Sequence, residues 1–216
     1  MGGAAAAQSA RSLVEAGAQA LVSFGMAGGL DPALVPGTLF LPSEVVSADG
    51  AAVIATAQVW REHLRARMAR DASGGGPGRE GPARKGPGSS QPVLGGRLLT
   101  TLKAVGTQAD KALLFKQTGA LAVDMESLAI AEVAHRCGLP FIAIRVIVDG
   151  ASDTLPRAVT AAADSEGHLQ IGRLLGALAR QPGELPALIR LGQRYRAANR
   201  SLAAVARLGL SGGTVG

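Results

Sequence analysis

The sequence has one cysteine, few aromatic residues and no long apolar run. Cys137 is the only cysteine among 216 residues, which excludes a disulfide within the sequence and predicts a reducing, cytoplasmic environment. Its position late in a helical pattern predicts a buried structural thiol. No run reaches the roughly 18 apolar residues of a membrane-spanning helix. The first residues lack the basic and apolar regions of a secretory signal peptide, so we expect a cytoplasmic protein.

Aromatic residues make up only 3% of the chain, although its net charge is +6. Nucleic-acid binding surfaces usually interleave basic residues with aromatic side chains that stack on bases. The basic C-terminal segment contains one tyrosine, Tyr195, so we expect no nucleic-acid partner. The histidines at 63, 135 and 168 show no metal-ligand spacing. The glycine-rich segment 25–30 matches neither the GxGxxG nor the GxxxxGK[ST] motif, and we expect no metal, NAD or P-loop nucleotide.

The chain is 47% hydrophobic, which is sufficient for one α/β domain with a substantial core. The informative stretch is 120–153. Residues 121–123 form a short apolar strand, 130–135 a helix, and 141–148 a β-branched strand that ends at Asp149. Ligands of open α/β sheets bind at the carboxyl ends of strands. We therefore predict that Glu126 and Asp149 face one crevice, on adjacent parallel strands.

The two carboxylates suggest acid chemistry. Asp149 follows an apolar strand, and partial burial raises the pKa of a carboxyl, so that it can act as a general acid near neutral pH. Glu126 opens a helix, where the macrodipole favours the ionised form. An ionised glutamate can accept hydrogen bonds from sugar hydroxyls. The alternative interpretation is that Glu126 caps the helix and Asp149 caps the following turn.

Other patterns complete one domain over residues 1–208, with a flexible tail at 209–216. We expect helices at 8–16, 58–70, 108–117, 168–179 and 186–208, and strands at 20–24, 38–47 (bent by a proline), 51–57 and 92–105. Residues 25–30 should form a loop of small residues. Val59, Leu64 and Met68 should share the apolar side of the helix at 58–70. Residues 71–90 are rich in glycine and proline, which predicts a disordered insertion.

Three features have two interpretations each. The helix at 186–208 has an apolar face and several arginines, so it either packs on the domain or a second subunit, or makes peripheral contact with a membrane. Arg145 is either an anion ligand or half of a buried ion pair. Asp153 either assists the site or is a solvated turn residue in a polar loop, 150–156, that could border the pocket.

Three motifs carry a family resemblance. They are Val-Asp-Met-Glu-Ser (123–127), Gly-Leu-Pro-Phe (138–141) and Ile-Arg-Val-Ile-Val-Asp (144–149). In this order they resemble the purine nucleoside phosphorylase and methylthioadenosine/S-adenosylhomocysteine nucleosidase superfamily. Residues 23–30 look like its glycine-rich ribose and base loop. Leu155-Pro156 and the segment 182–186 resemble the hopanoid-associated phosphorylase group, and the likeness spans about 11–208.

The resemblance implies a three-layer α/β/α fold with a mixed central sheet. Because the sequence starts near the family's first helix, we expect the first strand to be lacking. By resemblance, Asp149 donates a proton to N7 of adenine and Glu126 binds the ribose 2′- and 3′-hydroxyls. The other implied substrate contacts are Met125 against the sugar, the backbone of Met26, Ala27 and Gly28, and Val148, where many of these nucleosidases have serine.

Three functions follow. The first is release of adenine from a 5′-substituted adenosine, with adenosylhopane as the substrate that the hopanoid likeness favours. The second is the same cleavage of methylthioadenosine or S-adenosylhomocysteine. The third is a non-catalytic nucleoside- or lipid-binding protein. Water and phosphate both remain open as the nucleophile; phosphate would then be a co-substrate. The resemblance also implies a homo-oligomer of at least two subunits.

Overall fold

The strand β8 (Phe141–Asp149) lies at the centre of the fold, and all nine of its residues are buried. The computed structural model describes residues 2–72, 92–156 and 182–209. Nearly all of the expected insertion at 71–90, the helix expected at 168–179 and most of the expected tail lie outside these residues. A run of β-branched and aliphatic residues suits a strand that is covered on both faces, which explains the position of β8.

Eight strands of the described residues form one sheet in the order β4-β3-β6-β7-β1-β8-β2-β5. Their bounds are β1 Leu21–Gly29, β2 Leu39–Leu41, β3 Glu44–Ser47, β4 Val53–Ala55, β5 Val93–Leu94, β6 Arg97–Thr100 and β7 Ala120–Asp124. The pairs β1–β8, β2–β5, β3–β6 and β6–β7 are parallel, and the pairs β1–β7, β2–β8 and β3–β4 are antiparallel. The predicted mixed sheet is confirmed.

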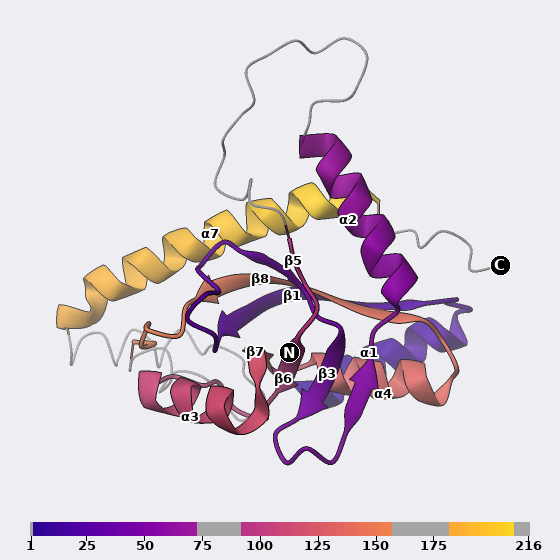
Figure 1. The fold of residues 1–216 in the computed structure, drawn as a ribbon, viewed down its shortest axis with the longest axis horizontal. Helices are drawn as coiled ribbons and strands as arrows, with labels where there is room; N and C mark the ends of the chain where they lie inside the picture. Colours follow the sequence, from indigo (N-terminus) through magenta and orange to yellow (C-terminus); the bar gives the residue numbers. More distant parts are fainter. Residues whose placement is uncertain (1, 73–91, 157–181, 210–216) are drawn as a thin grey trace, which may run out of the picture.

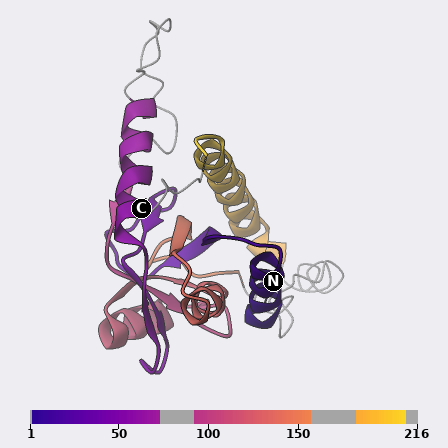
Figure 2. The same ribbon diagram turned by 90° about the vertical axis from the view of Figure 1, so that its right-hand side faces the viewer.

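Helices cover both faces of the sheet (Figure 1). Their bounds are α1 Gly3–Glu15, α2 Gln58–Ala72, α3 Gln108–Thr118, α4 Ser127–Arg136 and α7 Leu185–Arg207, which follows the 3-10 turn Pro182–Glu184. In Figures 1 and 2, α2 and α7 lie on one face, and α1 and α4 on the other. Alternate β8 residues follow this division, since Ile142 and Ile144 pack with α2 and α7, whereas Ala143 and Ile147 pack with α1 and α4. The α/β/α layering is therefore confirmed.

The long helix α7 packs on the domain, as one interpretation of its apolar face predicted. Ala198 and Leu202 are buried against Val146 and Val148 of β8. Val205 joins the cluster that α2 forms with the sheet. Within the described residues, none of the helices has the length and hydropathy that crossing a bilayer requires.

The glycine-rich segment 25–30 is not the loop that we expected. The strand β1 continues through it to Gly29 and pairs with β8 from Leu21 opposite Phe141 to Gly28 opposite Asp149. A Cβ added at Gly25 would make ordinary contact with the Arg145 guanidinium at 3.5 Å, whereas one at Gly28 would crowd Asp149 Oδ2 at 3.2 Å and one at Gly29 the Leu34 carbonyl oxygen at 3.0 Å. Gly28 and Gly29 thus let neighbouring groups lie close to the backbone of an extended strand.

The expected strand at 38–47 is two strands. Pro42 separates β2 from β3, and the two lie far apart in the sheet, β2 beside β8 and β3 beside β6. Proline offers no backbone N–H for a ladder, which explains the break. The segment 92–105 is likewise divided into β5 and β6. The first helix, expected at 8–16, begins earlier, at Gly3, and the other expected helices and strands within the described residues are confirmed to within about three residues.

Two side-chain predictions are wrong. Val59 is 59% exposed, because α2 presents Trp60 and Leu64 to the sheet instead. Cys137 is exposed rather than buried, because it follows the last residue of α4 as its C-cap.

The strands that carry the two acidic motifs are neither adjacent nor parallel, contrary to our prediction. β1 lies between β7 and β8, antiparallel to β7 and parallel to β8. The crossover through α4 therefore spans one strand. The two acidic ends nevertheless converge, because Gly28 of β1 is in register with both Val123 and Asp149.

Candidate active site

Gly28 is the point where the ends of β7 and β8 meet. A Cβ built there would lie 3.2 Å from Asp149 Oδ2, 3.4 Å from Oδ1 and 3.5 Å from Val123 Cγ1. The register of β1 against β8 shifts between Ala27 and Gly28, as in a β-bulge. Bulges often redirect side chains beside active sites. Here the bulge and the missing side chain together allow the Asp149 carboxyl to lie against β1.

Asp149 is 5% exposed and forms a buried ion pair with Lys111 of α3. Lys111 Nζ donates to Asp149 Oδ2, to the Gly150 carbonyl (2.8 Å) and to the Asp153 carbonyl (3.0 Å). The sequence analysis did not identify Lys111. A usable signal was present, since Lys111 lies three and four residues before Leu114 and Phe115, which pack on the sheet. A lysine on an apolar helix face requires a buried partner.

The environment of Asp149 suits a general acid. Burial raises the pKa of the Asp149 carboxyl and the Asp153 charge adds to this, while Lys111 and Arg194 oppose it. The expected direction of the pKa shift is therefore confirmed. The alternative interpretation, in which Asp149 caps the turn after β8, is wrong. Asp153 caps this turn instead, because its Oδ2 accepts the Gly150 N–H at 2.8 Å. Asp153 is a structural turn residue at the edge of the site.

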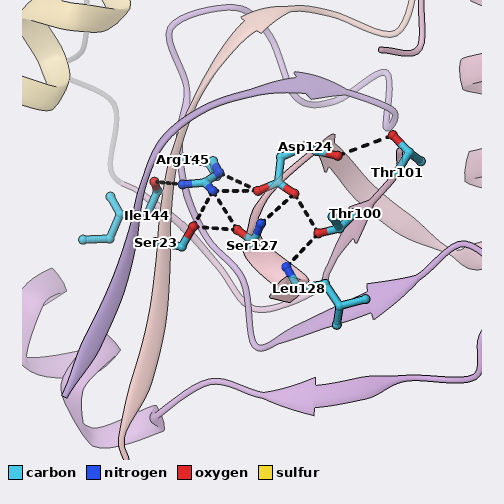
Figure 3. Close-up of polar contacts among 8 residues, drawn as sticks. All are labelled: Ser23, Thr100, Thr101, Asp124, Ser127, Leu128, Ile144 and Arg145. Carbon is cyan, nitrogen blue, oxygen red and sulfur yellow. Dashed lines mark hydrogen bonds and ion pairs between the residues drawn. The ribbon is translucent and has the colours of Figure 1, made fainter. Parts of the chain in front are cut away.

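Arg145 forms a buried ion pair with Asp124 (Figure 3). Its Nε and Nη2 donate to Asp124 Oδ2 at 2.8 and 2.6 Å. Nη2 also donates to Ser23 Oγ at 2.6 Å and to Ser127 Oγ at 2.7 Å. The other carboxylate oxygen, Oδ1, accepts from Thr100 Oγ1 at 2.7 Å and from the Ser127 N–H at 3.3 Å. Of the two interpretations of Arg145, the structure favours the buried pair, which ties β1, β7, β8 and the start of α4 together.

Glu126 lies at the N-cap of α4 and makes no capping hydrogen bond with its side chain. Burial raises the pKa of the Glu126 carboxyl, the nearby Asp124 charge raises it further, and Arg145 opposes them. We expected the helix dipole to favour the ionised form. That prediction is wrong in direction, because burial and a neighbouring carboxylate outweigh the dipole. The capping alternative is wrong as well, since Asp124 accepts the Ser127 N–H instead.

Tyr195 of α7 lies close enough to Asp149 and Glu126 for their charges to affect the pKa of its phenol. Burial raises the pKa of the Tyr195 phenol, and the charges of Asp149 and Glu126 raise it further. The side chain is still 48% exposed, so it borders the site from the solvent side. In the sequence, Tyr195 is the tyrosine of the basic C-terminal segment, and nothing there connects it with the acids.

The remaining predicted contact residues have different surroundings. Gly28 lies directly beside Asp149, and Met125 is half-buried between Asp124 and Glu126. Ala27 is buried in the core cluster that includes α1 and α4. Met26 and Val148 pack with α7 on the opposite face. The side chains of Met26, Ala27 and Val148 therefore pack in the core, and β1 contacts Asp149 through its backbone at Gly28.

A cavity of about 90 Å³ opens beside Asp149. Its walls are Asp149, Asp153, Thr154, Leu155 and Pro156 on one side and Ala187, Arg190, Leu191 and Arg194 of α7 on the other. Arg194 Nη1 lies 2.6 Å from Asp153 Oδ2 and joins the two walls. The prediction that the loop at 150–156 borders a pocket is confirmed. Among the described residues, no group of three or more His, Cys, Asp and Glu side chains is placed to hold a metal ion.

Comparisons with known proteins agree with this architecture. The sequence profile of the family described as Phosphorylase superfamily matches residues 1–179. The structure is similar to a methylthioadenosine/S-adenosylhomocysteine nucleosidase from Colwellia psychrerythraea in complex with adenine (TM-score 0.66, 17% identity, 97% of this chain and 74% of that one). It is also similar to the S-adenosylhomocysteine nucleosidase of Streptococcus pyogenes (0.66, 19%, 96% and 74%) and the futalosine hydrolase of Helicobacter pylori (0.60, 18%, 96% and 76%). No curated protein matches the sequence.

Proposed function

The chain belongs to the phosphorylase superfamily, and from this premise we propose that it cleaves the N-glycosidic bond of a 5′-substituted adenosine and releases adenine. The observation that carries the proposal is Asp149, a buried carboxyl of raised pKa at the carboxyl end of the central strand. A carboxyl whose pKa is raised by burial holds its proton to a higher pH than an exposed one, which suits it to donate that proton to a leaving base. The charges of Asp149 and Glu126 both raise the pKa of the Tyr195 phenol, so the two acids lie near the same side chain of α7.

The proposed chemistry divides the work between these two acids. Cleavage of a glycosidic bond passes through a transition state with oxocarbenium character, in which the sugar loses electron density and the base gains it. Asp149 donates its proton to N7 of adenine, so that the base departs neutral. Glu126 accepts hydrogen bonds from the ribose 2′- and 3′-hydroxyls. An oxygen of water or phosphate then forms the new bond at C1′.

Replacing Glu126 with glutamine should weaken ribose recognition. We expect kcat/KM for the ribonucleoside to fall by about 10–100-fold, which corresponds to the 1.5–3 kcal/mol of a hydrogen bond to a charged group. The value for the 2′-deoxynucleoside should change little. Glu132→Gln, on the exposed side of the same helix, provides the control. Equal activity of the native protein on ribo- and 2′-deoxynucleosides would remove Glu126 from this role.

For the 5′ substituent we propose a hopanoid lipid, so that the substrate is adenosylhopane. The support is the likeness of Leu155-Pro156 to the hopanoid-associated group, together with the apolar walls that Leu155 and Leu191 give the cavity. Helix α7 exposes Leu185 and Ile189 beside arginines, an arrangement suited to peripheral contact with anionic lipid. The alternative is a small group, as in methylthioadenosine, and the small size of the cavity, about 90 Å³, favours it.

Adenine release from purified protein tests the proposal. The substrates are 5′-methylthioadenosine and an adenosine with a long 5′-alkyl group, each assayed with and without phosphate. Release that requires phosphate identifies a phosphorylase, and release without it a nucleosidase. A higher kcat/KM for the long-chain substrate supports the lipid, and the reverse order supports the small group. No release from folded protein that binds both nucleosides would leave the binding-protein function.

A further inference from the structure

Lys111 is fully buried, and all three of its ammonium protons are accounted for. The acceptors are Asp149 Oδ2 and the carbonyl oxygens of Gly150 and Asp153. A lysine ammonium has three donors and no acceptor. Lys111 therefore has no free donor for a ligand, and its effect on chemistry must pass through the residues that it already contacts.

The position of Lys111 is fixed by its helix. Thr107 caps α3 by accepting the Asp110 N–H at 3.1 Å, and Leu114 and Phe115 anchor the following turn against the sheet. Burying an ammonium without a charged partner lowers the stability of the folded state, so the buried position of Lys111 depends on its ion pair with Asp149. The pair also fastens the turn that follows β8.

We propose that Lys111 is the positioning residue for the acid: it holds Asp149 by Oδ2, leaves Oδ1 for the leaving base, and stabilises the negative charge that Asp149 acquires as it gives up its proton. No hydrogen bond within the described residues engages Oδ1. This inference rests on the proposed function. In that step the C1′–N9 bond breaks, its electron pair goes to the base, the Asp149 proton goes to N7, and an oxygen nucleophile bonds to C1′.

The charge balance of the step explains why this contact favours the reaction. In the proposed step Asp149 reacts in its protonated form, whose contact with Lys111 is one between a cation and a neutral group; proton transfer produces the carboxylate that pairs with Lys111 in the structure, so the attraction is stronger in the transition state than in the ground state. Interactions that strengthen in this way are the ones that accelerate a reaction. The other groups that face Asp149 are Asp153, Arg194 and Tyr195. Arg194 is paired with Asp153, which leaves Lys111 as the cation in direct contact with the acid in the described structure.

Lys111→Met should weaken Asp149 as an acid while increasing the fraction of it that is protonated. An opposite charge in contact lowers a carboxyl pKa by about 1–3 units, so its loss should move the alkaline limb of the pH profile upward by about that amount. The acid donates only when protonated, and activity is therefore lost as pH rises through its pKa. On the plateau at lower pH, kcat should fall by about 10–100-fold, because a weaker acid transfers its proton more slowly.

The titration of Asp149 can also be followed without turnover, by carbon-13 NMR of the aspartate carboxyls with Asp149→Asn for assignment. We expect an upward shift in Lys111→Met and none in Lys116→Met, which removes an exposed lysine from the same helix. If Lys111→Met does not fold, Lys111→Gln keeps amide donors for the two carbonyls and removes the charge. An unchanged Asp149 titration in the folded variant overturns the proposal. A shifted titration in a protein that cleaves no nucleoside overturns the proposed function instead.

Discussion

Asp149→Asn should reduce adenine release by about 10²–10⁴-fold, the usual contribution of a general acid. Asparagine keeps the shape of the side chain but has no acidic proton to give to N7. Substrate binding should remain within a few fold of the native value, because the backbone of β1 and Glu126 are unchanged. Steady-state kinetics and calorimetric titration with a nucleoside measure the two quantities separately.

This variant needs a control for folding, because it leaves Lys111 buried without its charged partner. The double variant Asp149→Asn/Lys111→Met removes both charges. It should recover most of any lost stability and none of the lost activity. Asp49→Asn, in an exposed turn, is the matched aspartate control and should be as active as the native protein. Native activity in Asp149→Asn would assign the acid role to another residue.

The sequence indicated Asp149 because the signal was local. An uninterrupted β-branched run predicts a buried strand, and the residue that follows it must lie at the carboxyl edge of the sheet. The position of Asp149 could therefore be predicted from its neighbours in the sequence. The resemblance supplied the same residue independently. The fold class and most helices were predictable for the same reason, since hydrophobic periodicity is read over neighbouring residues.

Features that depend on distant contacts were not predictable. The sequence gives no indication that β1 separates β7 from β8, because strand order is decided by pairing between remote segments. Lys111 lies 38 residues from Asp149 along the chain, and the helix that carries it showed only a lysine on an apolar face. The direction of the Glu126 pKa shift was misjudged because burial and the proximity of Asp124 are tertiary properties, whereas the helix dipole is a local one.

The glycines of β1 show how composition can mislead. Gly25, Gly28 and Gly29 suggested a loop, since glycine is common in turns and disfavoured in strands. In the structure they lie in a strand, where a Cβ would crowd the Asp149 carboxyl at Gly28 and the Leu34 carbonyl oxygen at Gly29. The sequence correctly indicated close approach to this segment, but the groups that approach it belong to the protein itself.

Arg145→Met should be the most destabilising of the changes considered, lowering the free energy of unfolding by about 3–5 kcal/mol, the cost of breaking a buried ion pair by removing one partner. The Asp124 carboxylate would remain buried without its cation. For a chain of this size the loss corresponds to about 6–20 °C in Tm. Denaturant and thermal unfolding measure it.

The exposed pair of Arg136 and Glu132, one helical turn apart in α4 with a separation of 3.8 Å, supplies the control. Arg136→Met should cost about 0–1 kcal/mol, as exposed ion pairs do. Asp124→Leu combined with Arg145→Met should recover part of the stability, because no uncompensated charge then stays buried. A loss below about 1 kcal/mol in Arg145→Met would contradict the structural role. Suppose that Arg145→Met also removed the dependence of adenine release on phosphate. Arg145 would then be an anion ligand, the other interpretation of this residue. An arginine can bind an anion in the folded protein only if it can leave Asp124 at little cost in stability.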